Sequence, residues 1–169
     1  IDKMMDWYEA TRNNAAISVR DQQWLLVGPW VHGGSGAAYV GSSVQGELNY
    51  PNAEYVSDTM AWNFLNYYLL DTPNNWQNTP LITYYETGTN IWLTSGATRI
   101  DATGTNTLNF NQNGQLTSDN GVSSTSFVSN PSSPCPTIGG PTLSTSLDQG
   151  PHDQISLEAR PDVITFETA

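Results

Sequence analysis

The sequence predicts an α/β unit followed by an all-β region, and three observations carry this prediction. The apolar run Trp24-Leu25-Leu26-Val27 lies between two segments whose apolar residues recur at helical spacing. Further along, short β-favouring segments alternate with turn dipeptides such as Asn113-Gly114. All 6 tryptophans lie in residues 1–93, whereas residues 94–150 consist mainly of Ser, Thr, Asn and Gly with few charges. The two parts of the chain therefore differ in architecture.

Two helices and one strand are predicted in the first part. Residues 2–14 place Met4, Met5 and Tyr8 on one helical face. Residues 23–28 form a strand that is apolar on both faces, which is typical of a central parallel strand. Residues 56–70 read as a second helix, with Ser57 or Asp58 as the N-cap. The buried face of that helix is expected to carry its aromatic residues, Trp62, Phe64, Tyr67 and Tyr68.

The second part is predicted to be built from strands. Residues 80–87 and 90–95 are expected to pair as a hairpin. Further strands are expected at residues 99–102, 107–110, 123–128 and 163–167. Turn-forming residues at 71–75 suggest a boundary near residues 72–80. We therefore divide the chain into a first domain, residues 1–78, and a second domain, residues 79–169.

The pentapeptide Gly28-Pro29-Trp30-Val31-His32 is the strongest functional signal. A buried strand that stops at Gly-Pro and delivers a histidine into a glycine-rich loop is a known way to present a general base. His32 is therefore the catalytic candidate, although an isolated histidine in such a loop is by default a surface residue. Trp30 could line a substrate pocket, but a tryptophan at a strand end more often serves packing.

Three further blocks follow the pentapeptide. Residues 86–92 contain a Gly-x-Asn-x-Trp run, residues 130–140 read Asn-Pro-Ser-Ser-Pro-Cys-Pro-Thr-Ile-Gly-Gly, and residues 150–164 combine Gly-Pro-His-Asp-Gln with Glu-Ala-Arg-Pro-Asp-Val-Ile. In this order the four blocks resemble the CocE/NonD serine hydrolases, the group of cocaine esterase, α-amino-acid ester hydrolases and X-Pro dipeptidyl-peptidase relatives. The resemblance spans residues 24–169. It implies the C-terminal end of an α/β-hydrolase sheet followed by the start of a jelly-roll β-sandwich.

The resemblance implies a Ser/Asp/His triad that cleaves esters, amides or peptides by acyl transfer to water, with His32 as its base. No Gly-x-Ser-x-Gly elbow for the nucleophile occurs in the chain. The triad aspartate is expected just before Ile1, and Asp2 is the nearest carboxylate, although no Gly-Trp precedes it. We therefore expect a fragment of a longer enzyme that is inactive alone. Its expected partners are a small ester or peptide substrate and the remainder of the enzyme or other copies of the chain.

Composition excludes several other classes of function. The net charge is −11 with only 5 basic residues, so no basic patch for nucleic acid is expected. The acidity favours a substrate with an α-ammonium group, although an acidic surface that only aids solubility explains it equally well. One cysteine and two distant histidines make no disulfide or metal set, so no cofactor or metal is expected. No apolar run could span a bilayer and none resembles a signal peptide, which leaves a cytoplasmic or secreted location open.

The alternative function is a non-catalytic β-sandwich module for binding or oligomerisation, in which the histidine motif is idle. From residue 94 onward the only aromatic residues are Phe110, Phe127 and Phe166, which offers no Trp or Tyr platform for sugars. The carboxylates near Arg160 lack the spacing of a calcium loop, so an ion-pair network is expected there. His152 is expected to be structural.

Overall fold

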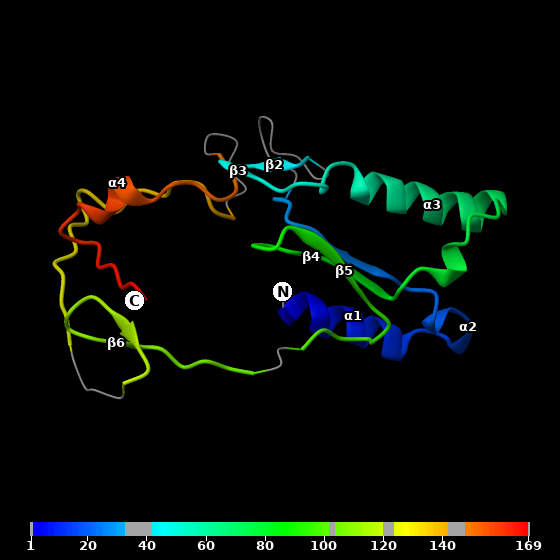
Figure 1. The fold of residues 1–169 in the computed structure, drawn as a ribbon, viewed down its shortest axis with the longest axis horizontal. Coiled ribbons are helices and arrows are strands. Elements are labelled where there is room, and N and C mark those ends of the chain that lie inside the picture. The colour runs from blue at the N-terminus through cyan, green and yellow to red at the C-terminus, as the bar shows by residue number, and fades with distance from the viewer. Residues whose placement is uncertain (1, 33–41, 102–103, 120–123, 142–147, 169) are drawn as a thin grey trace.

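The structure, a computed structural model, describes residues 2–32, 42–101, 104–119, 124–141 and 148–168. It combines helices with small sheets, in agreement with the coarse prediction of an α/β unit plus β structure. Figure 1 shows a layered α/β unit at one end of the molecule, and the described residues 104–119, 124–141 and 148–168 extend away from it as an open arc.

One three-stranded sheet forms the centre of the α/β unit. Its strands are β1 (Leu25–Val27), β4 (Ile82–Glu86) and β5 (Ile91–Ser95), in the order β1-β4-β5. β1 and β4 run parallel, and β4 and β5 are antiparallel. Helix α3 (Val56–Leu70) lies in the crossover from β1 to β4, which makes a β-α-β unit. The predicted strand at residues 23–28 is thus confirmed over Leu25–Val27, but it lies at the edge of the described sheet rather than at its centre.

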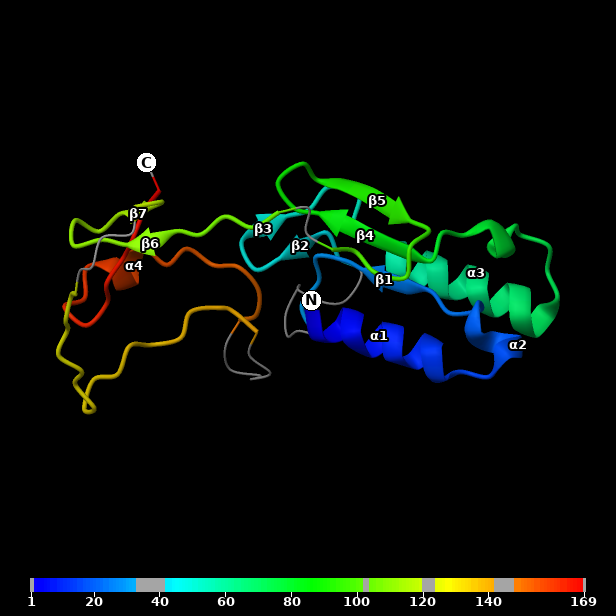
Figure 2. The same cartoon turned by 90° about the horizontal axis from the view of Figure 1, so that it is seen from below.

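Helix α1 (Asp2–Asn14) covers one face of this sheet and α3 covers the other (Figures 1 and 2). Met5 and Tyr8 of α1 are buried against Ile82. Leu25 and Val27 pack on the same cluster because residues two apart on a strand face the same side. The Tyr8 hydroxyl also donates a hydrogen bond to the carbonyl of Gln23, at 2.9 Å. The predicted helix 2–14 is confirmed, and so is the burial of Met5 and Tyr8, whereas the expected place of Met4 on the same face was wrong because its side chain is exposed.

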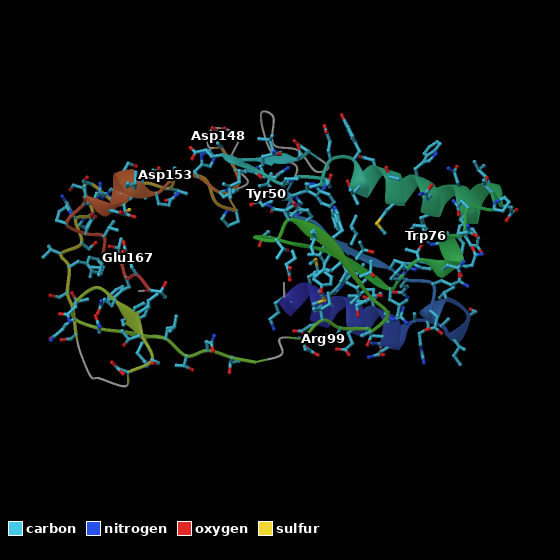
Figure 3. All side chains as sticks on the ribbon, in the orientation of Figure 1. Tyr50, Trp76, Arg99, Asp148, Asp153 and Glu167 are labelled. Atoms are coloured by element: carbon cyan, nitrogen blue, oxygen red, sulfur yellow. The ribbon has the colours of Figure 1, made fainter. Side chains whose placement is uncertain are left out.

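The opposite face carries an aromatic cluster between β1 and α3. The ring of Trp24 lies 5.1 Å from that of Trp76 and 6.1 Å from that of Phe64, centroid to centroid. Trp76 belongs to the short 3-10 helix η1 (Trp76–Asn78) and points back toward α3 (Figure 3). Tyr68 completes the cluster through its contacts with Trp24 and Phe64. The prediction for Trp62 was wrong, since its side chain is 66% exposed.

The bounds of α3 match the predicted helix, but its N-cap does not. The N-cap is Tyr55, which has a left-handed backbone and makes no capping bond through its side chain. Ser57 and Asp58 lie inside the first turn. Asp58 still favours the helix there, because a carboxylate near the N-terminus interacts well with the helix dipole.

The predicted hairpin is confirmed as β4 and β5, but its position differs from the expected one. We placed it at the start of a second domain beginning at residue 79, whereas β4 pairs with β1 in the first sheet. Residues beyond the hairpin remain tied to this unit, because Arg99 forms ion pairs with Asp6 and Glu9 of α1 (Figure 3). The α/β unit therefore continues past residue 79.

Less regular structure than predicted follows residue 95. The strands there are β6 (Asn109–Phe110) and β7 (Leu116–Thr117), which form a two-stranded sheet, and helix α4 (Ile155–Glu158) comes later. The described residues of the predicted strands 99–102 and 123–128 are not in strands, and within 163–167 only Glu167 forms a bridge, with Gln115. Residues 124–137 are all exposed, so no apolar face is available to stabilise a sheet. The jelly-roll stays a prediction.

Two small elements complete the fold. Helix α2 (Ile17–Arg20) links α1 to β1, and the hairpin of β2 (Val44–Gln45) and β3 (Leu48–Asn49) precedes α3. Among the described residues, no helix is both long and apolar enough to cross a membrane.

Candidate active site

The histidine motif begins where β1 ends, and its first residue has a steric reason to be glycine. The indole of Trp30 folds back over Gly28, so a Cβ at position 28 would collide with the ring. Trp30 also lies against Trp92 of β5, with 5.8 Å between ring centroids. Trp30 therefore packs in the structure and at the same time lines a cleft described below.

A buried side chain holds the backbone just before His32. The side-chain oxygen Oε1 of Gln45 accepts a hydrogen bond from the Val31 N–H, at 2.9 Å. The Nε2 group of the same amide donates to the Ser42 carbonyl, at 3.0 Å. Gln45 is fully buried. The histidine segment is thus tied to the β2–β3 hairpin through one side chain.

His32 itself is exposed and lines a cleft of about 290 Å³. The other wall of the cleft comes from the far end of the chain, from Gly140, Pro141, Gln149 and Gly150. Topology places His32 beyond the carboxyl end of a parallel strand, where open α/β sheets bind their ligands. The predicted placement of His32 at the surface of a cleft agrees with this geometry, and its catalytic role stays a prediction.

The far wall of the cleft is held against the hairpin by a set of short contacts. Gly140 and Gly150 form an antiparallel bridge, with N···O distances of 2.7 and 3.1 Å. The Glu47 N–H then donates to the Pro151 carbonyl, at 2.9 Å. Gly46 (φ +57°) approaches that same carbonyl so closely that a Cβ would clash with it. These contacts bring residues 140–151 onto the segment that contains Gln45.

Glu47 adds a charged contact to this junction. Its carboxylate accepts a hydrogen bond from the Asp153 N–H at 2.9 Å and lies 3.2 Å from Nδ1 of His152. The backbone N–H of Asp153 and, secondly, the His152 side chain hold the pKa of Glu47 below its usual value. His152 is thereby engaged in a structural contact outside the cleft lining, as expected. Figure 3 shows Asp153 near the start of α4.

Single residues of the four sequence blocks lie close together near Trp30 and His32. The first block contains His32, and Trp92 of the second block stacks on Trp30. Gly140 of the third block and Gly150 of the fourth line the cleft beside His32. Segments that are separated by most of the chain therefore converge at one place.

Several parts of a complete hydrolase site are absent from the described residues. There the ring of His32 has no hydrogen-bond or ion-pair partner, and no Gly-x-Ser-x-Gly segment exists to supply a nucleophile. Asp2 begins α1, but its side chain and the glycine-rich residues 33–41 lie outside the described part of the chain. The part of the chain that the structure describes also holds no group of three or more His, Cys, Asp or Glu side chains fit for a metal.

The predicted ion-pair network is smaller than expected. Arg160 binds Asp162 through two bonds of 2.8 Å and also donates to the Ser133 carbonyl. This guanidinium holds the pKa of Asp162 below its usual range. Asp153 instead accepts the Ile155 N–H at the start of α4. Among the described residues, Arg160 therefore pairs with Asp162 and Ser133, and not with Asp153 or Glu158.

Sequence reasoning missed Gln45 and Glu47. Both lie in a short Val-Gln-Gly-Glu-Leu segment whose polar residues resemble those of any surface turn. Gly46 lies in a short turn flanked by the apolar residues Val44 and Leu48, a pattern that could have indicated a hairpin. Nothing in the local sequence shows that this hairpin contacts Pro151. Comparison with family models, with curated proteins and with solved structures finds no match to this chain.

Proposed function

We propose that the chain supplies the general base and part of the substrate cleft of a serine hydrolase that cleaves esters, amides or peptides. The single observation that supports this most is the convergence of the four sequence blocks on His32 and its cleft. The β-α-β arrangement adds support, because it puts His32 beyond the carboxyl end of β1. The described lining of the cleft includes no serine or aspartate. In this proposal both come from other residues of a longer enzyme, with Asp2 as a further candidate for the aspartate.

In this proposal His32 removes the proton from the serine hydroxyl as the oxygen attacks the carbonyl carbon. The same imidazolium then gives the proton to the leaving alcohol or amine, and water releases the acyl group by the reverse route. The exposed ring of His32 at the cleft is accessible for both transfers. General-base help of this type contributes about 10²- to 10⁴-fold in rate. Trp30 would form one wall of the substrate pocket.

A second candidate, an oligomerisation module, has its own observation in favour. Among the strands that the structure describes, β1 pairs with β4 alone and so lies at the edge of its sheet. An apolar groove of about 580 Å³ lies along its open side, between α1 and α3. Trp7, which is 71% exposed, and Leu65 line this groove. Open edges of this type tend to pair with another chain.

The hydrolase proposal is tested in the complete protein that contains this chain, with p-nitrophenyl acyl esters as substrates. His32→Ala should lower kcat/KM at least about 10²-fold, which is the lower bound for a general base. His152→Gln is the matched control, because it removes the other imidazole, which does not line the cleft, and keeps an amide that can donate to the Glu47 carboxylate. A folded His32→Ala enzyme that stays within about tenfold of the wild type would refute the proposal.

A further inference from the structure

Gln45 is a fully buried polar side chain that binds the backbone directly before His32. It is one of the two largest side chains that are fully buried, and the other is the core residue Ile82. Both ends of its amide are used, one on Val31 and one on Ser42. Its burial places an amide in an apolar setting, which costs free energy unless the hydrogen bonds are made.

The Gln45 amide therefore fixes a specific backbone geometry. The accepted N–H belongs to Val31, the residue directly before His32. Gly150 packs closely against both Val31 and Gln45. A Cβ atom added at position 150 would lie 3.2 Å from Cγ1 of Val31 and 3.1 Å from the backbone carbonyl carbon of Gln45. Val31 is thus held by the hairpin on one side and by the cleft wall on the other. An apolar side chain at position 45 would leave the Val31 N–H without this acceptor.

We propose that Gln45 is a positioning residue for His32, which holds the imidazole at the cleft through the Val31 N–H. This inference rests on the proposed function. A general base must lie within hydrogen-bond reach of the group it deprotonates, about 2.6–3.2 Å. A displacement of about 1 Å can cost about 10²-fold in rate. The role of Gln45 is to prevent that displacement, and it touches no substrate.

The test uses the complete enzyme with three variants. Gln45→Met keeps the length of the side chain but removes both hydrogen bonds. Gln45→Glu keeps an acceptor for the Val31 N–H. Its ionised carboxylate, however, repels the Ser42 carbonyl, which in the wild type accepts a hydrogen bond from the Gln45 amide. Asn74→Leu is the matched control, because the Asn74 amide also bridges a backbone N–H, of Trp76, and a backbone carbonyl, of Asn63. Asn74 lies past the far end of α3, a helix of 15 residues or about 22 Å.

We expect Gln45→Met to lower kcat at least about tenfold and to leave KM within about threefold of the wild type. The residues that line the cleft are unchanged in this variant, whereas the general base His32 is displaced. Asn74→Leu should lower the urea midpoint but leave kcat within about twofold. For Gln45→Glu, the ratio of its activity to that of the wild type should rise as the pH falls. Protonation of the introduced carboxyl restores a donor toward Ser42, and burial raises the pKa of that carboxyl.

Three results would overturn the inference. The first is a kcat for folded Gln45→Met within about twofold of the wild type. The second is a Gln45→Glu activity ratio that does not change with pH. The third is failure of both Gln45 variants to fold while Asn74→Leu folds, which would make Gln45 a residue of the fold alone. Failure of the proposed function itself is distinguished by His32→Ala, which would then retain activity.

Discussion

The indole rings of Trp30 and Trp92 lie 5.8 Å apart at an interplanar angle of 43°. Trp30 follows β1, and Trp92 belongs to β5, the strand at the opposite edge of the same sheet, so this contact links the two edges. It also explains why the strand exit must be a glycine, because the Trp30 ring occupies the space above Gly28. The position of the histidine segment thus depends on packing as well as on hydrogen bonds.

Gly28→Ala should destabilise the fold by about 1–3 kcal/mol, since an added methyl group forces the Trp30 ring to move. Urea unfolding followed by tryptophan fluorescence measures this. Gly96→Ala is the control, because no atom lies within 4 Å of the added methyl group there. Equal midpoints for the two variants would show that Trp30 does not pack on Gly28.

Gly46→Ala should weaken the junction between the β2–β3 hairpin and the segment around Pro151. The left-handed backbone alone costs about 1–2 kcal/mol for a residue with a Cβ. The clash with the Pro151 carbonyl adds to this cost. Gly88→Ala serves as the control, because Gly88 has a positive φ but no neighbour within 4 Å. Unfolding free energies that fall by the same amount in both variants would contradict the contact with Pro151.

The contact of Glu47 with Asp153 should make stability depend on pH in the acid range. The pKa of Glu47 is lower in the folded state, so the stabilisation is present above its ordinary value of 4.5 and is lost as the pH falls below it. Glu47→Gln should therefore have a lower urea midpoint than the wild type at pH 7, and the difference should shrink below about pH 4. A difference that stays constant from pH 7 to pH 3 would rule out this role of the carboxylate.

The open edge of β1 should make the 169-residue chain associate at micromolar concentration. Light scattering measures the oligomeric state. Trp7→Lys and Leu65→Lys should reduce association, because they put a charge into the apolar groove. Trp62→Lys is the control, since Trp62 is also exposed on α3 but does not line the groove. A monodisperse monomer would show that the edge is not used.

The same 169 residues should show no hydrolysis of p-nitrophenyl acyl esters above background. A histidine without its serine has only water to activate, and the members of a triad act as a unit. Steady-state assay of the purified chain at pH 7–8 checks this. Turnover that His32→Ala abolishes would show that the chain holds its own nucleophile.

Local patterns in the sequence were enough to determine α1, α3, β1 and the β4–β5 hairpin. Each of these elements has an apolar face or a turn that can be read within about fifteen residues. The helix predicted at residues 56–70 has the observed bounds, because its aromatic residues repeat at helical spacing. The placement of His32 after a strand follows from the same local signals.

Only the tertiary structure decided which distant segments meet. The parallel pairing of β1 with β4 crosses the boundary that the turn-forming residues 71–75 suggested, because strand pairing depends on which edges can be buried together. Residues 124–128 lie in the predicted strand 123–128 but are exposed and not in a strand, because the β-favouring Phe127 and Val128 pack on no apolar surface of the described residues. The role of Gln45 depends on a hydrogen bond to Val31, 14 residues earlier in the chain. The role of Gly150 depends on contacts with Val31 and Gln45, more than 100 residues away, and no local pattern encodes such contacts.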